Sequence, residues 1–460
     1  MSGQGRSTLS ETESGHILDR LQGLEQIVSS DCVQEVLRQC NKVNGRSCPL
    51  THEVMLWVVL AMGLFTNVPI REAFRRSRRR QRGDKTPARS SLCAGRQRLG
   101  VEPLQALHQR VVRPLATPQT PGAFYQGMRL MALDGTILDA PDREANQSLG
   151  RSSGGRGDAA FPQVRKVSLV EVGTHVEIAL VHGGYHDSEQ ALVPALYDQI
   201  PSDALLLEDR GFFSYQSWKT LQNRCELLVR VKTQMVLPVH QRLSDGSYLS
   251  KVYSNSYDRD QDRNGVVVRV IEYTLNDPQR TGHGEVHCLI TSLLDEKTYP
   301  AKELICLYHE RWEIEMVFDE QKTHQDPLRA GKPTHLRSET PAGIAQELVA
   351  ISIGHFVVRA MMLQAAEQAD LDVDRLSFVG CFRILQTRLP ECNATCAEGC
   401  WQWFEALKEE MLEEKIPPRS NRVNPRVIKR KMKKWKKKRP HHRGIEPLTK
   451  TFGQTIVMET

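Results

Sequence analysis

The chain reads Met-Arg-Leu-Met-Ala-Leu-Asp-Gly-Thr from Met128 to Thr136, a short apolar run that ends in Asp134. A run of this length bounded by turn-forming residues is typical of a buried β-strand. A second run, 204–207, ends in Glu208-Asp209-Arg210-Gly211. The two runs predict a sheet in which two buried strands each end in an aspartate.

The segments around these two runs predict the rest of the sheet. They are, in order, alternating strands at 164–172 and 175–182, a helix at 188–200, a helix at 214–225 and a strand at 226–231. The full order is three strands, helix, strand, helix, strand, which predicts a mixed α/β sheet. In such a sheet the first and fourth strands can be neighbours, so Asp134 and Asp209 can meet at one edge.

A third acid lies in Tyr308-His309-Glu310-Arg311-Trp312-Glu313-Ile314-Glu315, which is followed by Lys322. On an α-helix these spacings place the Tyr308, Arg311, Glu315 and Lys322 side chains on one face. The carboxylate suits a hard divalent cation, and the other three side chains suit phosphate oxygens. The alternative is a solvated amphipathic helix with ordinary ion pairs, and this segment alone does not separate the two.

The three acids together predict a metal site. Converging carboxylates repel one another and need divalent cations. Two Mg²⁺ ions roughly 4 Å apart would activate an attacking oxygen and stabilise a leaving one. An aspartate at a strand end is also a common turn former, and we interpret the nearby Asp139 and Asp142 as turn residues or as residues that support the metal ligands.

Positive charge is concentrated in two segments. Twelve lysines and arginines and no acids lie between Arg422 and Arg443, while the net charge is only +7, so the remainder is net acidic. A second basic cluster spans Arg71 to Arg82. Such blocks favour a polyanion, and Trp435 among lysines would allow a base to stack. The alternative for the C-terminal block is a solubilising tail.

The apolar segments and cysteines predict a soluble, cytoplasmic protein. The N-terminus lacks a secretory pattern, and the longest apolar run, Met55 to Phe65, is too short to span a bilayer. The 351–363 stretch contains His355 and Arg359 and predicts a buried helix. Most cysteines sit singly in apolar segments. Three more are spaced by four without a further ligand at zinc-finger spacing, so their role stays open: Cys392, Cys396 and Cys400.

Taken together, the motifs Asp134-Gly135-Thr136, Asp209-Arg210-Gly211-Phe212 and Y-x2-R-x3-E-x6-K resemble those of the DDE transposases of the bacterial insertion element four family. The supporting matches are Gly150-Arg151-Ser152 with Phe161-Pro162, Leu92 to Gly100, and Arg337-Ser338 before the helix of Glu347. The resemblance spans roughly residues 20 to 440.

The resemblance implies a ribonuclease H-like mixed-sheet catalytic core with a β-rich insertion, preceded by an α-helical N-terminal domain. The expected boundaries are a disordered N-terminus at 1–15, a helical DNA-binding domain at 16–122, a core at 123–232 and 298–370, the insertion at 233–297, and a helical and basic C-terminal region at 371–460. Within the N-terminal domain, 87–114 could be a helix-turn-helix-like reader or an ordinary helical segment.

The resemblance also implies site residues and a cofactor. Asp134, Asp209 and Glu315 would be the catalytic metal ligands, for two Mg²⁺ ions per site with Mn²⁺ able to substitute. Three side chains would contact DNA phosphates: Tyr308, Arg311 and Lys322. Arg210 is a further candidate phosphate contact, with a structural ion pair as its alternative.

The implied activity is cut-and-paste DNA transposition. A homodimer, not associated with a membrane, would cleave terminal inverted repeats and transfer the strand to target DNA at the bacterial nucleoid. No tryptophan lies between Trp218 and Trp312, so a base-holding aromatic would be a tyrosine such as Tyr248, Tyr253 or Tyr257, or would be absent. A DNA hairpin step therefore stays open. The alternatives are a catalytically retired DNA-binding protein and a metal-dependent nuclease that cuts without joining.

Overall fold

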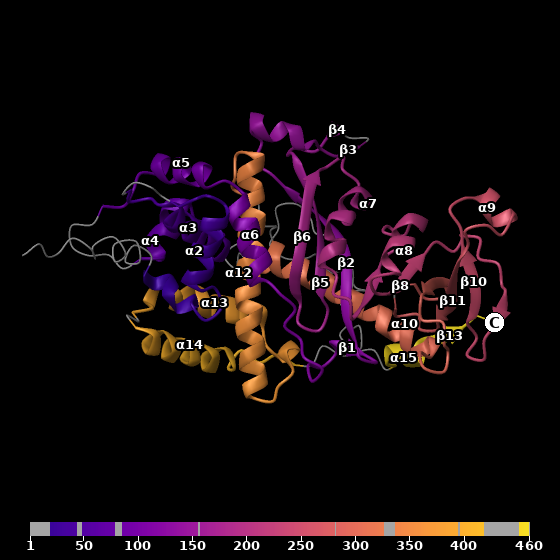
Figure 1. The fold of residues 1–460 in the computed structure, drawn as a ribbon. Helices are drawn as coiled ribbons and strands as arrows, with labels where there is room; N and C mark the ends of the chain where they lie inside the picture. Colours follow the sequence, from indigo (N-terminus) through magenta and orange to yellow (C-terminus); the bar gives the residue numbers. More distant parts are fainter. Residues whose placement is uncertain are drawn as a thin grey trace, which may run out of the picture. The chain divides into compact units, whose positions relative to one another are not determined.

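The computed structural model in Figure 1 describes residues 19–43, 48–78, 85–154, 157–280, 282–325, 336–393, 396–417 and 450–459. The chain forms two compact units. The first contains Met1–Pro121, Gly135–Leu192 and Glu315–Ile416, and the second contains Gly122–Asp134, Val193–Ile314 and Pro417–Thr460. The expectations for 1–15, for 79–82 of the arginine cluster and for the basic block at 422–443 lie outside the described residues.

Helices form most of the first unit. They are α2 (Ser30–Gln39), α3 (His52–Leu64), α4 (Ile70–Arg76), α5 (Arg89–Leu99), α6 (Glu102–Val111), α12 (Pro341–Gln368), α13 (Phe378–Arg388) and α14 (Ala397–Met411). The continuous apolar sequences of α3 and α12 predict buried helices, and both are buried along nearly their whole length. A side chain at Gly63 of α3 would overlap the carbonyl oxygen of Ala350 in α12, so only glycine permits this close approach.

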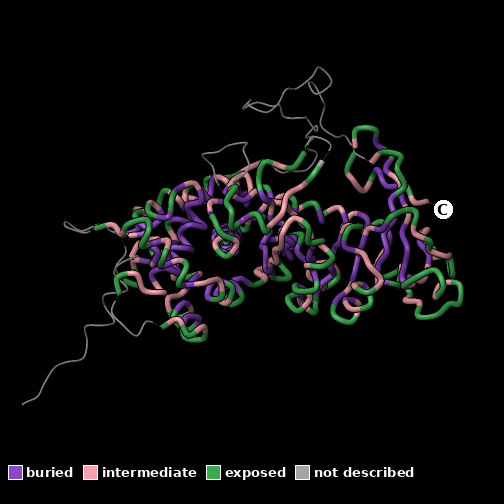
Figure 2. Tube along the Cα trace, turned by 90° about the horizontal axis from the view of Figure 1, so that it is seen from above, coloured by how far each residue is buried: buried purple, intermediate pink, exposed green. Residues whose placement is uncertain are grey.

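Helix α12 is the one described helix that is long and apolar enough to cross a membrane, but 94% of its apolar window is buried inside the protein. That burial is typical of the core helix of a globular fold. The tube in Figure 2 shows buried stretches running through helices and strands, with exposed stretches mainly in the connections.

A strand hairpin packs against α12 in the first unit. Strands β5 (Gln163–Glu171) and β6 (Val176–Gly184) pair antiparallel from Val164↔Gly184 to Glu171↔Val176, which confirms the predicted hairpin. The order is β6-β5-β2, in which the first unit contains residues 135–139 of β2 (Met128–Asp139). The hairpin therefore has one edge next to the strand that carries Asp134.

The strands of the second unit begin with residues 128–134 of β2. The order is β2, β7 (Ala204–Glu208), β8 (Glu226–Val231), β12 (His287–Thr291), β11 (Val266–Leu275), β10 (Tyr248–Val252) and β9 (Gln241–Arg242). The first three are parallel, and the others pair antiparallel. Two short strands also join, β1 (Phe124–Tyr125) on β2 and β13 (Ile456–Met458) on β11.

The core strands have the order expected of a ribonuclease H-like fold. Numbered along the chain, β2, β5, β6, β7 and β8 are arranged 3-2-1-4-5. The predicted helices between them are present as α7 (Glu189–Leu192) with the 3₁₀ helix η3 (Val193–Gln199), and as α8 (Tyr215–Leu221). The mixed α/β fold class is confirmed. Residues 233–297 contain β9 to β12 and the short helix α9 (Ser256–Asp260).

The expected helix around Tyr308 is divided into four pieces. They are α10 (Ala301–His309), the 3₁₀ turn η4 (Glu310–Trp312), α11 (Glu313–Asp319) and the π-helical turn η5 (Glu320–His324). A single run of 3.6 residues per turn therefore does not describe this segment. The four side chains predicted on one face belong to four different turns.

Candidate active site

Asp134 and Asp209 lie in one row across two parallel strands of the second unit. The last paired residues of β2 and β7 are Leu133 and Glu208, and the two aspartates follow them. Neighbouring strands are about 4.8 Å apart, and successive side chains point to opposite faces. Leu133 and Glu208 are accordingly buried, whereas both aspartates are half-buried. The predicted meeting of the two aspartates is therefore present in the sheet.

The position of Asp134 within its strand differs from the prediction. Strand β2 continues for five residues to Asp139, so Asp134 is inside the strand and not at its end. The strand was predicted to end at Asp134-Gly135-Thr136, and aspartate and glycine do disfavour strands. Pairing with β7 stops just before Asp134, so the aspartate still lies beside the end of a neighbouring strand.

Arg311 supplies positive charge to this row. Its Nη1 donates to Asp134 Oδ2 at 3.1 Å, and its side chain is only 6% exposed. Burial by itself lowers the pKa of Arg311, but Tyr308, Asp134 and Asp209 outweigh it and raise the pKa above its usual value. Arg311 is therefore a fixed cation facing both aspartates.

Tyr308 is buried beneath the guanidinium of Arg311. The centre of that guanidinium lies 5.8 Å from the ring centroid, and the hydroxyl donates to the Glu208 carbonyl at 3.3 Å. Burial raises the pKa of Tyr308, so the phenol is neutral. Tyr308 thus connects α10 to the end of β7 through a hydrogen bond, and its ring packs against the guanidinium of Arg311.

Arg230 extends the same row and was missed in the sequence analysis. Glu208 of β7 pairs with Val229 of β8, so Arg230 stands on β8 level with Asp209. Its Nη2 donates to His287 Nδ1 at 3.0 Å. The sequence offered one indication of this residue, a single arginine within the otherwise apolar run 227–231. It could be interpreted only once the register of β7 and β8 was known.

Glu208 adds no negative charge to the row near neutral pH. It is 3% exposed, and burial raises its pKa to about 8. The negative charge at this edge therefore comes from Asp134 and Asp209. Arg210 is exposed beside them, and its backbone N–H donates to Asp209 Oδ1 at 2.8 Å.

Glu315 and Lys322 belong to the first unit. Glu315 is an exposed residue of α11. Lys322 is in η5, and its Nζ donates to Thr136 Oγ1 at 2.8 Å and to the Ile137 carbonyl at 2.9 Å. Burial lowers the pKa of Lys322. The structure thus places Tyr308 and Arg311 together in one unit, and Glu315 and Lys322 in the other.

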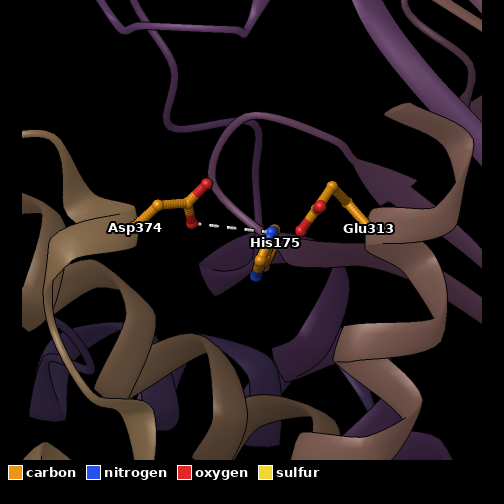
Figure 3. A group of neighbouring side chains, drawn as sticks. All are labelled: His175, Glu313 and Asp374. Carbon is orange, nitrogen blue, oxygen red and sulfur yellow. Dashed lines mark ion pairs between the residues drawn. The ribbon is translucent and has the colours of Figure 1, made fainter. Parts of the chain in front are cut away.

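Figure 3 shows a histidine and an aspartate of the first unit that the sequence analysis did not single out, drawn with Glu313 of the second unit. His175 Nε2 lies 3.7 Å from Asp374 Oδ1. The other ring nitrogen, Nδ1, accepts a hydrogen bond from Arg359 at 2.6 Å. Both nitrogens of His175 are therefore engaged within the first unit, which favours a structural role.

The aspartate row fits a divalent cation. Carboxylate oxygens are the donors that Mg²⁺ and Mn²⁺ prefer, and both aspartates are partly accessible. One buried guanidinium, that of Arg311, faces two carboxylates. The pair therefore retains negative charge that a cation can neutralise.

Three tyrosines and three cysteines left open by the sequence differ in their surroundings. Tyr248 is buried and Tyr253 donates to Asp262, whereas Tyr257 is 64% exposed. Cys392 and Cys400 are buried. Cys396 accepts a hydrogen bond from the Gly399 N–H at the start of α14. These positions leave Tyr257 as the most accessible aromatic of the insertion and give Cys396 a helix-capping role.

The fold and the aspartate row define the class of protein, a DDE transposase. A family model described as "Transposase DDE domain" matches residues 125–351, and one described as "Insertion element 4 transposase N-terminal" matches residues 18–109. Together they cover more than half of the chain. The protein belongs to the insertion element 4 family of DDE transposases, as its motifs predict.

Two curated relatives carry transposase names. The chain is 25% identical over 443 residues to "Transposase InsG for insertion sequence element IS4" of Escherichia coli strain K12, covering 94% of this chain and 97% of the relative. It is 26% identical over 206 residues to "Putative transposase InsZ" of the same strain, covering 42% and 65%. The solved piggyBac transposase synaptic complex with hairpin DNA aligns with 86% of this chain and 86% of its own, at 11% identity and a TM-score of 0.41.

Proposed function

We propose that this transposase cleaves DNA at terminal inverted repeats in a Mg²⁺-dependent reaction and transfers the freed 3′ end to target DNA. The observation that carries the proposal is the row of Asp134 and Asp209 on neighbouring parallel strands, with Arg311 facing both. That row combines cation-binding carboxylates with a fixed positive charge, as phosphoryl transfer on a DNA backbone requires.

Asp134, Asp209 and Glu315 would hold two Mg²⁺ ions, with Mn²⁺ able to substitute. Bound divalent cations lower the pKa of water and neutralise charge on the attacking and leaving oxygens. The proposed role of the surrounding residues is to position the phosphate. Arg311 is desolvated and already oriented, so its charge acts without reorganisation when negative charge develops on the phosphate.

The other basic side chains would bind phosphates on either side of the cleaved bond. Arg210 is exposed next to Asp209, and Arg230 is level with it on β8. Lys322 presents its ammonium beside Thr136, two residues beyond Asp134 on β2. Tyr308 would act by supporting Arg311, with its hydroxyl held on the Glu208 carbonyl.

The proposed substrates are the terminal inverted repeats and the target DNA, bound by a homodimer in the bacterial cytoplasm at the nucleoid. The helical region before residue 122 would recognise the repeats. The domain boundaries expected from the sequence remain part of this proposal. The match of the first family model to residues 18–109 supports a distinct N-terminal part.

Strand cleavage and joining with labelled repeat-end DNA would test the proposal. We expect Asp134→Ala, Asp209→Ala and Glu315→Ala each to reduce cleavage by on the order of 10³-fold while end binding is retained, because several kcal/mol of charge stabilisation is lost. Asp142→Ala is the matched control, since this carboxylate is nearby in sequence but pairs with Arg151 at 2.6 Å on the surface.

The pattern of products separates the alternatives. Cleavage and joining by the wild type and by Asp142→Ala alone would support the transposase. End binding without any chemistry by the wild type would favour a retired DNA-binding protein. Cleavage without joining would favour a nuclease, and full cleavage by Glu315→Ala would remove that residue from the site.

A further inference from the structure

The π-helical turn η5 is an unusual piece of backbone in the first unit. The Gln325 N–H donates to the Glu320 carbonyl at 2.6 Å, five residues back, which is the bond that defines a π-turn. Such turns are rare and often occur at functional sites. This one contains Lys322 and directly follows the α11 helix of Glu315.

Glu320 anchors the start of this turn to α12. It is 3% exposed, and its Oε2 accepts from Arg359 Nε at 3.0 Å and lies 2.9 Å from His355 Nε2. Arg359 Nη2 donates to the other carboxylate oxygen. A buried carboxylate held by three hydrogen bonds from two side chains of α12 leaves the turn little freedom to rotate about its axis.

Gln321 anchors the next residue to the β5–β6 hairpin through a separate network. It is 5% exposed, its Nε2 donates to Glu177 Oε2 at 3.0 Å, and its Oε1 accepts from Lys166 Nζ at 2.6 Å. Lys166 and Glu177 are themselves paired at 2.6 Å. Consecutive residues of one turn are therefore bonded to two different elements.

Gln325 provides a third set of hydrogen bonds at the C-terminal end of the turn. Gln325 Nε2 donates to the carbonyls of Gly63 and Ile351 at 2.9 Å and 3.0 Å, and Gln325 accepts from Thr66 Oγ1 on its own carbonyl. Between these anchors, Lys322 is left half-buried and directed at Thr136 and Ile137 of β2. Burying so many polar groups costs free energy that an apolar core would avoid, which favours a positioning purpose over a purely stabilising one.

We propose that Glu320 and Gln321 are positioning residues that hold η5 in the register required for Lys322 to meet a DNA phosphate. The inference rests on the proposed function, in which Lys322 is a phosphate contact. Neither Glu320 nor Gln321 touches DNA in this scheme. Each acts by fixing the backbone on one side of Lys322.

The test compares two buried glutamines of the first unit. Gln321→Met keeps the side-chain length and removes the bonds to Glu177 and Lys166. Gln346→Met is the matched control, because Gln346 is 3% exposed and its amide is also hydrogen-bonded on both atoms, away from η5. Its Nε2 donates to the Arg96 and Gly100 carbonyls, and its Oε1 accepts from Arg96 Nε. We expect both variants to lower the melting temperature by a similar amount.

The readout is the salt dependence of repeat-end binding. Loss of one phosphate contact reduces the slope of log K against log salt by about 0.9. Lys322→Ala and Gln321→Met should both show this fall, and Gln346→Met should not. The double variant of Gln321→Met with Lys322→Ala should bind as Lys322→Ala does, because both changes remove the same contact. Glu320→Gln should repeat the result of Gln321→Met.

Two results would overturn the inference. Equal slopes for Gln321→Met and the wild type, with a reduced slope for Lys322→Ala, would overturn the positioning role and leave Lys322 as a phosphate contact. An unchanged slope for Lys322→Ala would overturn both the positioning role and that part of the proposed function. Should Gln321→Met not fold, the same comparison is made with Glu320→Gln, and the same two results apply.

Discussion

Two buried glutamates of the first unit and one of the second differ in charge. In the first unit, Glu177 and Glu320 are buried and ionised: the pKa of Glu177 is lowered to about 2 and that of Glu320 lies well below its usual value. In the second unit, Glu208 is equally buried, and its pKa is raised to about 8.

The difference in pKa comes from the charged and hydrogen-bonding neighbours of each glutamate, not from the extent of burial. Burial by itself would raise the pKa of all three glutamates. For Glu177 the charge of Lys166 and hydrogen bonds from Lys166, Ser168 and Ser352 outweigh burial. For Glu320 the charge of Arg359 and a hydrogen bond with His355 do so. No such partner offsets burial at Glu208, so it stays protonated. Ion pairing thus keeps Glu177 and Glu320 charged in the first unit, whereas Glu208 adds no charge beside Asp134 and Asp209 in the second.

The largest expected effect comes from removing the buried ion pair between Arg359 and Glu320 in the first unit. Arg359→Leu leaves the Glu320 carboxylate buried without its cation, and we expect it to lower the free energy of unfolding by about 3–5 kcal/mol. Denaturant unfolding measures this. Arg388→Leu is the control, because Arg388 pairs with Glu410 and Glu391 at the surface, where solvent and salt screen ion pairs and the expected loss is small. Equal losses would contradict the assignment of a buried, ionised Glu320.

Replacing Glu208 of the second unit should stabilise the protein at high pH, whereas Arg359→Leu destabilises it. The pKa of Glu208 is about 8 in the folded protein, against an ordinary value of 4.5, so between these values Glu208 is ionised only in the unfolded chain. Stability therefore falls as pH rises through that window, by about 1.4 kcal/mol per pH unit from this group. Glu208→Gln removes this pH-dependent loss of stability. The free energy of unfolding of the variant, relative to that of the wild type, should therefore increase from pH 5 to pH 8. A constant difference would mean that Glu208 is ionised in the folded protein.

The smallest of the three effects on stability is expected for Glu177→Gln at acidic pH. Glu177 has a folded pKa of about 2, below its ordinary 4.5, so its stabilisation is complete above about pH 4.5 and is lost as pH falls toward 2. The wild type should therefore lose its advantage over Glu177→Gln between pH 6 and pH 3, again by about 1.4 kcal/mol per unit inside the narrower window. Thermal unfolding of both proteins across this range checks the sign. An advantage that grows in acid would contradict it.

The fold and the aspartate pair were predictable because their signals are local. Apolar runs and alternation between 128 and 231 predicted the succession of strands and helices along the chain. Two strands ending near aspartates indicated that the aspartates can meet. The continuation of β2 through Gly135 and Thr136 was not predictable from local preference, because pairing in the sheet overrides the turn tendency of that sequence. Arg230 was missed for a related reason, since its place depends on the register between β7 and β8.

The sequence by itself determined the order of strands, the acids and basic residues of the motifs, and through them the family. Tertiary structure decided which of those side chains face one another and which acids are charged. Glu320 is ionised because Arg359, 39 positions away, reaches it, and Gln321 is held by Lys166, 155 positions away. Glu208 is neutral because burial raises its pKa and no opposing charge offsets that effect. A pKa depends on the charges and solvent within a few ångströms, and folding brings those neighbours from distant parts of the chain.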